Sequence, residues 1–386
     1  MGYSENCLPK ALAALGHEVH LVTSNAQTFF DLPSYRETYE PFIGPGLVPC
    51  ETRFLDGYTL HRLPYGRLAG RLRIRGLGPK LGELRPEVVQ TFDAMSLSTL
   101  EAAWAQSQLA YKLFLESHLH ASVFDPQRRR QRQGWLWWFY RHTAGWLIRR
   151  RSVKCYPISE DAAQIAVEFM GMAKEKIEVC GLGVDTQLFR PPSGPAEQEQ
   201  RDALRLQLGF ESGEIVCIYT GRFASGKGPL VLAEAIAGQY QSAPKARGLF
   251  VGGGTQAEVA AIQRCRGCVV HPFVPARELP PFYWAADIGV WPRQESTSQL
   301  DAAACGLPII ISDQVTVRER AEGNGLFYPE GDALALRQQI VALSDAEARR
   351  RLGSAGSRKM AERYSWIRIA QQRIADYGEA LAHSRQ

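Results

Sequence analysis

Two loops carry the side chains best suited to chemistry, and each follows a short apolar run that predicts a strand. In the loop 219–228, Arg222 and Lys227 place two cations five residues apart among glycines. Arg offers a planar fork for phosphate, Lys a point charge, and glycine lets the backbone come close to a ligand. The loop is not a P-loop, because Gly228 stands where that motif needs Ser or Thr. Phosphate binding and an ordinary surface loop both stay open.

The other loop, within 291–308, ends a predicted strand at Pro292 and begins a helix. Ser296–Ser298 are good N-cap residues, and a helix N-terminus at the carboxyl end of a strand favours anions. Glu295 precedes this anion site and Asp301 lies just inside the helix, where a carboxylate can accept hydrogen bonds from two sugar hydroxyls. A capped helix with Asp301 as a favourable first-turn acid explains the same residues equally well.

Alternating apolar runs and helical patterns must position these loops, and that alternation is typical of a parallel α/β sheet. A Pro/Gly-rich stretch at 190–195, followed by the polar residues 197–202, is the best linker candidate between two α/β units. The predicted strands are 19–23, 88–92, 113–115, 153–158, 215–219, 248–251, 269–270, 288–291 and 309–312, and the predicted helices are 5–15, 230–237, 278–286, 299–304 and 367–382.

One expected element is missing near the start of the sequence. A doubly wound sheet has its first strand at the centre, with a ligand-binding loop after it. Here residues 1–4 lead straight into the predicted helix 5–15. We expect that the chain as given begins after this strand.

The composition excludes several classes of protein. With 45% hydrophobic and 22% charged residues the chain can bury a core, and a net charge of +5 is too mild for a dedicated nucleic-acid binder. It contains no apolar run long enough to predict a membrane span and no secretory signal pattern, which favours the cytosol. Among eight cysteines, Cys265 and Cys268 form a lone CxxC, for which we expect reduced thiols rather than zinc or redox chemistry.

Taken together and in order, several short motifs resemble glycosyltransferase family 4, whose members are retaining enzymes with the GT-B fold. Each motif is weak alone, but the set is specific and extends over essentially the whole chain. The motifs are Leu15-Gly16-His17-Glu18-Val19, Leu84-Arg85-Pro86-Glu87-Val88-Val89, Gly183-Val184-Asp185 with Phe189, Gly221-Arg222 with Lys227-Gly228, Gly252-Gly253-Gly254, Glu278-Leu279 with Ala286-Asp287, and Glu295 through Pro308.

The resemblance implies an α/β protein with two Rossmann-like, doubly wound domains that face a cleft. The implied domains are an acceptor-side domain at 1–190, a nucleotide-sugar-binding domain at 191–365, and a helix at 366–386 that crosses back to the first domain. The first strand of the N-terminal domain is the missing one.

The implied activity is that of a retaining hexosyltransferase. It moves a sugar from a nucleotide-diphosphate donor to a sugar or lipid-linked glycan acceptor, with no metal and no other cofactor. The resemblance gives catalytic roles to His118, Arg222, Lys227 and Glu295, and donor-binding roles to Gly2, Gly221, Ser296, Thr297, Ser298, Gln299 and Asp301.

Within this assignment, Arg222 and Lys227 neutralise the leaving diphosphate, which is electrostatic stabilisation of developing charge. Asp301 takes the ribose hydroxyls, and Glu295 contacts the donor sugar. His118 is the first choice for the histidine that faces the reacting sugar, and His120 is the second.

Two departures from the family pattern limit what can be carried over. The family usually has two Glu residues at a wider spacing, whereas five residues separate Glu295 from Asp301, so this loop is a compact variant. Pro272 stands where the nucleobase loop usually has Gly, so the resemblance assigns no preference for a base.

A patch rich in arginine and tryptophan occupies the region 128–151. Such a composition suits a helix lying on an anionic membrane surface, or a groove for a lipid-linked acceptor. A helix that packs its aromatics on the N-terminal domain is the alternative, while stacking on single-stranded nucleic acid is disfavoured by the modest charge. The residues of the patch are Arg128, Arg129, Arg130, Trp135, Trp137 and Trp138.

Two rival functions stay open beside the transferase. One is a nucleotide-sugar epimerase on the same fold, and the other is a non-catalytic, membrane-associated pseudo-glycosyltransferase. For the transferase we expect a role in polysaccharide biosynthesis, in the cytoplasm and peripheral on the inner face of the membrane.

Overall fold

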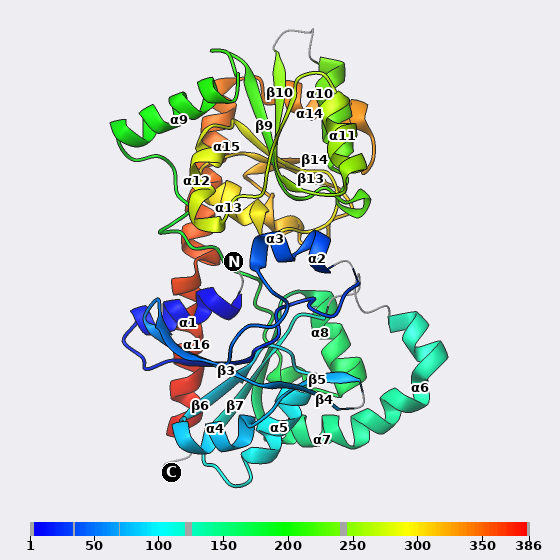
Figure 1. Cartoon of the computed structure of the whole chain (residues 1–386), viewed down its shortest axis with the longest axis vertical. Coiled ribbons are helices and arrows are strands. Elements are labelled where there is room, and N and C mark those ends of the chain that lie inside the picture. Colours follow the sequence, from blue (N-terminus) through cyan, green and yellow to red (C-terminus); the bar gives the residue numbers. More distant parts are fainter. Residues whose placement is uncertain (1–3, 34, 69, 120–125, 240–244, 384–386) are drawn as a thin grey trace. The chain divides into compact units, whose positions relative to one another are not determined.

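In the computed structural model the chain forms two units, and the structure describes residues 4–33, 35–68, 70–119, 126–239 and 245–383 (Figure 1). The C-terminal unit holds residues 183–368. The N-terminal unit holds the described residues before 183 and those from 369 onward.

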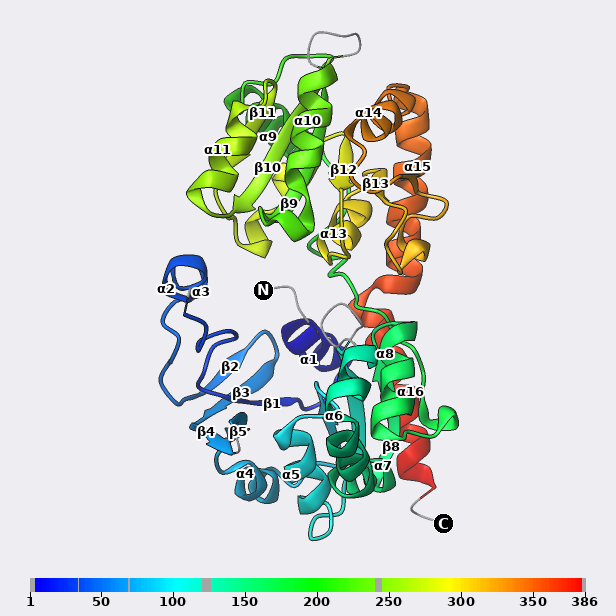
Figure 2. The same ribbon diagram turned by 90° about the vertical axis from the view of Figure 1, so that its right-hand side faces the viewer.

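The C-terminal unit is built on one parallel sheet with the strand order β11-β10-β9-β12-β13-β14. Helices cover both faces (Figure 2), so the strands are mainly apolar and largely buried, as in Ile309–Ser312, where every residue is buried. The strands are β9 (Ile215–Arg222), β10 (Ala246–Gly253), β11 (Cys268–His271), β12 (Ile288–Trp291), β13 (Ile309–Ser312) and β14 (Gly325–Tyr328). The helices are α9 (Pro195–Gln207), α10 (Pro229–Gln239), α11 (Gln256–Arg264), α12 (Pro280–Trp284), α13 (Ser298–Ala304), α14 (Ala333–Ala342) and α15 (Ala346–Lys359).

This strand order fixes where a ligand would bind. The order reverses between β9 and β12, and in open α/β sheets ligands bind at the carboxyl ends of the strands at such a switch point. Close packing beside it requires glycine: a Cβ on Gly252 would lie 2.0 Å from the carbonyl oxygen of Gly221 on the neighbouring strand. The loops after β9 and β12, predicted to carry the chemistry, therefore flank the switch point.

The N-terminal unit has its strands in several smaller sheets, with orders β1-β3-β2, β4-β5 and β6-β7-β8. In a doubly wound sheet one further strand would lie between β1 and β6, and none of the described residues forms it. The strands are β1 (His20–Ser24), β2 (Thr52–Leu55), β3 (Tyr58–Leu63), β4 (Tyr65–Leu68), β5 (Arg71–Ile74), β6 (Val88–Thr91), β7 (Lys112–Ser117) and β8 (Ser152–Pro157). The helices are α1 (Ser4–Ala14), α2 (Tyr35–Thr38), α3 (Glu40–Ile43), α4 (Leu77–Leu84), α5 (Leu97–Ala105), α6 (Pro126–His142), α7 (Ala144–Arg151) and α8 (Glu160–Ile165).

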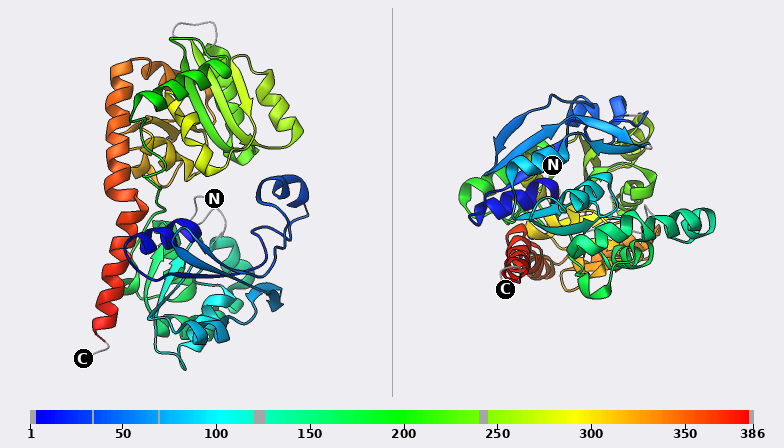
Figure 3. Two further views of the ribbon diagram at one scale, coloured as in Figure 1. Left: turned by 60° about the vertical axis from the view of Figure 1, so that its left-hand side comes forward. Right: turned by 90° about the horizontal axis from the view of Figure 1, so that it is seen from below.

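The last helix, α16 (Trp366–Ala382), begins among the residues of the C-terminal unit and continues in the N-terminal unit (Figure 3). There the Phe114 and Tyr377 rings meet edge-on at 4.7 Å, and Lys154 donates to Asp376 at 2.9 Å. One face of α16, with Arg373 and Asp376 buried, thus packs on β7 and β8 of the N-terminal unit.

Two predicted boundaries are wrong for identifiable reasons. Residues 197–202, predicted as linker, lie in α9, because Pro195 at the first position and Glu197 in the first turn favour a helix start. Residues 278–286, predicted as one helix, are divided between a 3₁₀ turn at Ala276–Glu278 and α12, since the prolines that open α12 have no N–H to continue the turn.

Candidate active site

The loop after β9 carries Arg222 and Lys227, as predicted. β9 is buried from Ile215 to Thr220 and emerges at Gly221 and Arg222, which are exposed. A 3₁₀ turn at Ser225–Lys227 then leads to Gly228, whose φ of 67° ends the turn before α10. Lys227 is half-buried, and burial together with the charge of Arg222 lowers the pKa of its ammonium.

The loop after β12 is joined to the first loop by a hydrogen bond. Lys227 Nζ donates to the carbonyl oxygen of Glu295 at 2.9 Å. The Glu295 carboxylate points elsewhere and accepts from the Thr316 amide at 3.1 Å and its hydroxyl at 2.8 Å. Burial alone would raise the pKa of Glu295, but hydrogen bonds from its own amide and from Thr316 bring it below the ordinary value.

Asp301 lies in the first turn of α13 and is half-buried. Burial, with the nearby charge of Asp185 in addition, raises the pKa of its carboxyl to about 8. Asp185 itself caps the following turn, accepting from the amide of Gln187 at 3.1 Å. The resemblance places Asp185 in one motif and Asp301 in another, and the fold of the C-terminal unit brings the two acids together.

The predicted cap at the start of α13 is wrong in detail. Thr297 at the N-cap has helical angles and makes no side-chain cap hydrogen bond. Ser296 instead accepts hydrogen bonds from two amides at the start of the helix. Its hydroxyl accepts from the Ser298 amide at 3.3 Å, and its carbonyl oxygen accepts from the Gln299 amide at 3.2 Å. The resemblance assigns Ser296, Thr297, Ser298 and Gln299 to the donor, and of their backbone amides those of Ser296 and Thr297 have no protein acceptor among the described residues.

Gln299, assigned to the donor, has a side chain that the sequence analysis did not consider. Its side chain is fully buried, and neither amide atom has a hydrogen-bond partner in the part of the chain that the structure describes. Leaving a buried amide unpaired costs free energy. The sequence gives no sign of this, because a Gln in a first helical turn is normally solvated.

The sequence analysis missed two cations that hold the same loops. Arg293 Nη1 lies 3.4 Å from the carbonyl oxygen of Ser225, which links the loop after β12 to the loop after β9. Arg320 is buried, and its Nη1 lies 3.4 Å from the carbonyl oxygen of Ser296. Arg293 stands two residues after a predicted strand end and could have been found; Arg320 comes from a 3₁₀ turn that no motif marks.

In the N-terminal unit, His118 follows β7 directly and is half-buried. Its Nε2 lies 3.3 Å from Glu116 Oε2. Burial lowers the pKa of His118, but the Glu116 carboxylate outweighs burial and leaves it raised. Glu116 is itself buried and faces Arg373 of α16, with Nη2 3.7 Å from Oε1.

Arg373 is an unusual partner, because its side chain is only 1% exposed. Its guanidinium carbon lies 3.0 Å from the centre of the Tyr156 ring, and among the described residues none of its side-chain nitrogens makes a hydrogen bond. Glu116 could have been found in the sequence as a lone acid in an apolar strand. Arg373 could not, since nothing local marks it.

Some assigned residues fall outside the description. Gly2 and His120 are not among the described residues, nor are the side chains of Arg128, Arg129 and Arg130. Trp137 is half-buried and meets Phe169 edge-on at 5.4 Å. Trp135 and Trp138 are exposed.

No group of three or more His, Cys, Asp or Glu among the described residues is arranged to hold a metal ion. No helix among them combines the length and apolar character needed to cross a membrane.

Comparisons with known proteins extend over both units. The model "Glycosyltransferase Family 4" matches residues 8–188, and "Glycosyl transferases group 1" matches residues 214–346. A curated relative, the D-inositol 3-phosphate glycosyltransferase of Xylanimonas cellulosilytica, is 29% identical over 237 residues, which are 58% of this chain and 56% of that protein. The chain spans about half the length of the curated relatives it matches.

Solved structures agree on the fold. Sucrose-phosphate synthase of Thermosynechococcus elongatus gives a TM-score of 0.68 at 21% identity, covering 97% of this chain and 92% of that one. The Anabaena protein HepE in complex with UDP gives a TM-score of 0.68 at 17% identity, covering 98% of both chains. The two family models together show that the chain belongs to glycosyltransferase family 4, and the structural likenesses show that it has the GT-B fold.

Proposed function

We propose that this chain is a retaining, metal-independent hexosyltransferase that moves a sugar from a nucleotide-diphosphate donor to a sugar or lipid-linked glycan acceptor. The observation that carries the donor half is the 2.9 Å hydrogen bond from Lys227 to the carbonyl oxygen of Glu295. It joins the loops after β9 and β12 at the switch point of the sheet, where this architecture binds ligands.

The charge at this junction suits a leaving diphosphate. Lys227 is held by a neutral carbonyl rather than by a carboxylate, so its positive charge is not cancelled. Arg222 ends β9 on the same loop. Two positioned cations stabilise the negative charge that develops as the donor bond breaks.

In this proposal Asp301 and Glu295 bind the ribose and the sugar of the donor. Asp301, in the first turn of α13, accepts from the ribose hydroxyls. Glu295 contacts the donor sugar, with one carboxylate oxygen fixed by Thr316. His118, held by Glu116, is the residue proposed for the reacting sugar.

Nucleotide binding tests the donor site first. Thermal unfolding is measured with UDP, GDP, ADP and dTDP, beginning with UDP because HepE, which has this fold, was solved with it. At about 100 times its dissociation constant the right nucleotide adds about 2.7 kcal/mol. We expect R222A/K227A to lose this gain and R350A/R351A, an exposed arginine pair on α15, to keep it. No gain with any nucleotide would overturn the donor site.

Product analysis tests the reaction. With the matching donor, NMR of the product should show the anomeric configuration of the donor, and activity should survive EDTA. Inositol 3-phosphate, named in the curated relative, is one soluble acceptor to include. Conversion of the donor alone into an isomer would favour the epimerase. Weak or absent nucleotide binding, with a phenotype that R222A leaves unchanged, would favour the pseudo-transferase. A cytoplasmic location peripheral to the membrane, and a role in polysaccharide biosynthesis, are further parts of the proposal.

A further inference from the structure

Four large aromatic side chains are exposed on α6 and α7. Trp135, Trp138 and Phe139 of α6 are 71%, 63% and 57% exposed, and Trp146 of α7 is 44% exposed. Figures 1 and 3 show α6 standing out from the body of the N-terminal unit. Soluble proteins seldom expose so many large apolar side chains together unless the surface meets a partner or a membrane.

The charged side chains of the same segment are positive. Residues 126–151 contain eight arginines and no Asp or Glu. Two of the described arginines are tied inward through carbonyls: Arg141 donates to the carbonyl of Glu168 at 2.9 Å, and Arg149 to that of Met170 at 3.2 Å. These contacts fix the helices against the unit without neutralising a charge.

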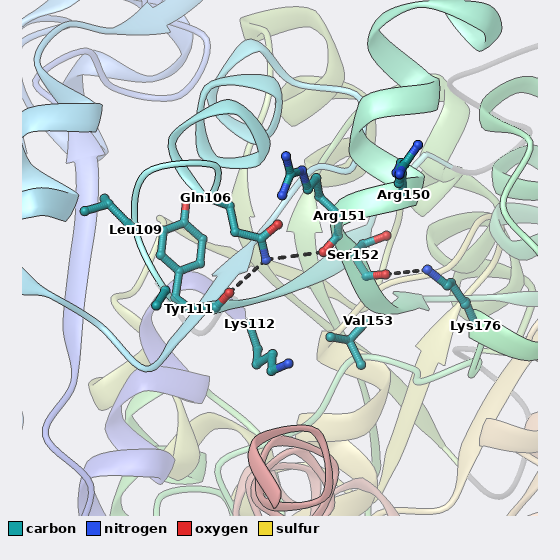
Figure 4. A pocket seen from close by; sticks show the side chains of 10 residues that line it. Gln106, Leu109, Tyr111, Lys112, Arg150, Arg151, Ser152, Val153 and Lys176 are labelled. Carbon is teal, nitrogen blue, oxygen red and sulfur yellow. Dashed lines mark hydrogen bonds between the residues drawn. The ribbon is translucent and has the colours of Figure 1, made fainter. Parts of the chain in front are cut away.

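A cationic pocket of about 590 Å³ lies at the end of α7 (Figure 4). Arg150 and Arg151 enter it from α7, Lys112 from the start of β7, and Lys176 from the 3₁₀ turn after α8. Lys176 also helps to hold the wall of the pocket together, because it donates a hydrogen bond to the carbonyl oxygen of Ser152 at 2.6 Å. None of the described residues that line the pocket is an acid.

The pocket is separate from the proposed reacting residues, and one of its arginines contacts the exposed Trp146. It lies at the amino end of β7, whereas His118 follows the carboxyl end of the same strand. The Arg150 guanidinium lies 5.2 Å from the centre of the Trp146 ring, one turn back on α7. A ligand in the pocket would therefore lie near Trp146, one of the four exposed aromatics.

We propose that α6, α7 and this pocket form a docking surface for a bilayer that contains anionic phospholipid. The aromatic rings lie at the level of the headgroups, where Trp is favoured, and the pocket receives a headgroup phosphate. Leu136, 43% exposed on α6, adds apolar area that a nucleic acid base could not stack on. The inference deepens the peripheral location proposed above and needs no glycosyl transfer, so either can fail without the other.

Flotation of the full chain with lipid vesicles tests the surface. We expect it to float with phosphatidylcholine mixed with phosphatidylglycerol and not with phosphatidylcholine alone. Each cation near an anionic surface strengthens binding roughly fivefold, so R150Q/R151Q should weaken it on the order of 25-fold at low salt. R350Q/R351Q, the exposed pair on α15, should bind like the wild type. W135S/W138S should lose binding at every salt concentration.

Thermal unfolding checks that each variant is folded. R150Q/R151Q should also keep the gain in thermal stability that UDP, GDP, ADP or dTDP gives the wild type. Three results would overturn the proposal. The first is that the chain does not float with the mixed vesicles. The second is that R150Q/R151Q and R350Q/R351Q lose vesicle binding equally. The third is that soluble glycerol phosphate or a single-stranded oligonucleotide displaces the chain from labelled vesicles as effectively as unlabelled vesicles do.

Discussion

Replacing Asp301 by Asn should remove a pH dependence of stability that the wild type carries. Its ordinary pKa of 3.8 is raised to about 8 in the fold, so between these values the folded state holds a proton that the unfolded state has released. The stability that this proton contributes is complete below the unfolded pKa and is lost as the pH rises through the folded pKa. Stability should therefore fall from acid to mildly alkaline pH.

The structure sets the size of the effect. Each pKa unit corresponds to about 1.4 kcal/mol, so the change between pH 5 and pH 8 is at most ~4 kcal/mol. Because the Asp301 carboxyl is half-buried and solvent reaches it, about half of that is the better expectation. D301N cannot titrate, so it should lose ~2 kcal/mol less than the wild type over this range.

Calorimetry at several pH values measures the difference, with the transition of the C-terminal unit resolved from that of the N-terminal unit. D202N, at an acid on α9 that is 62% exposed, is the matched control and should follow the wild type. UDP titration gives a second readout: ribose hydroxyls prefer an ionised carboxylate, so affinity should rise toward pH 8 in the wild type and not in D301N. Parallel stability curves for wild type and D301N would refute the reasoning.

Three further predictions concern buried polar groups. E116Q should lower the pKa of His118, which the Glu116 carboxylate holds up against burial, and NMR titration of the imidazole would show it; an unchanged pKa would contradict the assignment. R373L should cost about 3–5 kcal/mol because it leaves Glu116 buried without its cation, and R373L/E116L should recover much of that in urea unfolding. Q299L should stabilise the C-terminal unit by about 1–3 kcal/mol, since the buried Gln299 amide is unpaired; destabilisation would mean that it has a partner outside the described residues.

The sequence predicted the C-terminal unit well because its signals are local. Strands buried on both faces are continuous apolar runs, and β9, β12 and β13 were each found within a few residues of their bounds. The predicted linker at 197–202 and the predicted helix at 278–286 were wrong because prolines fix where α9 and α12 begin. In the N-terminal unit the hairpin β2–β3 was missed, although Asp56-Gly57, with φ of 50° and 89°, is a strong two-residue turn signal.

The candidate site was predictable only in part, for a physical reason. Motifs mark residues that touch ligands, so Arg222, Lys227, Glu295 and Asp301 could be assigned by resemblance. What each of them contacts depends on side chains distant in sequence, and Thr316 is one example. Burial, which raises the pKa of Asp301, is a property of the packed unit and has no local pattern.

The compact loop between Glu295 and Asp301 explains how the site can keep a positive charge. Lys227 and Arg320 bind the loop through the carbonyl oxygens of Glu295 and Ser296, so neither cation is cancelled by the contact that orders it. The Glu295 carboxylate is engaged by neutral groups of Thr316, and at neutral pH Asp301 is mainly protonated because its pKa is about 8. Arg222, Lys227 and Arg320 thus stand beside one ionised carboxylate of this loop, that of Glu295, and such a surplus of positive charge suits a diphosphate.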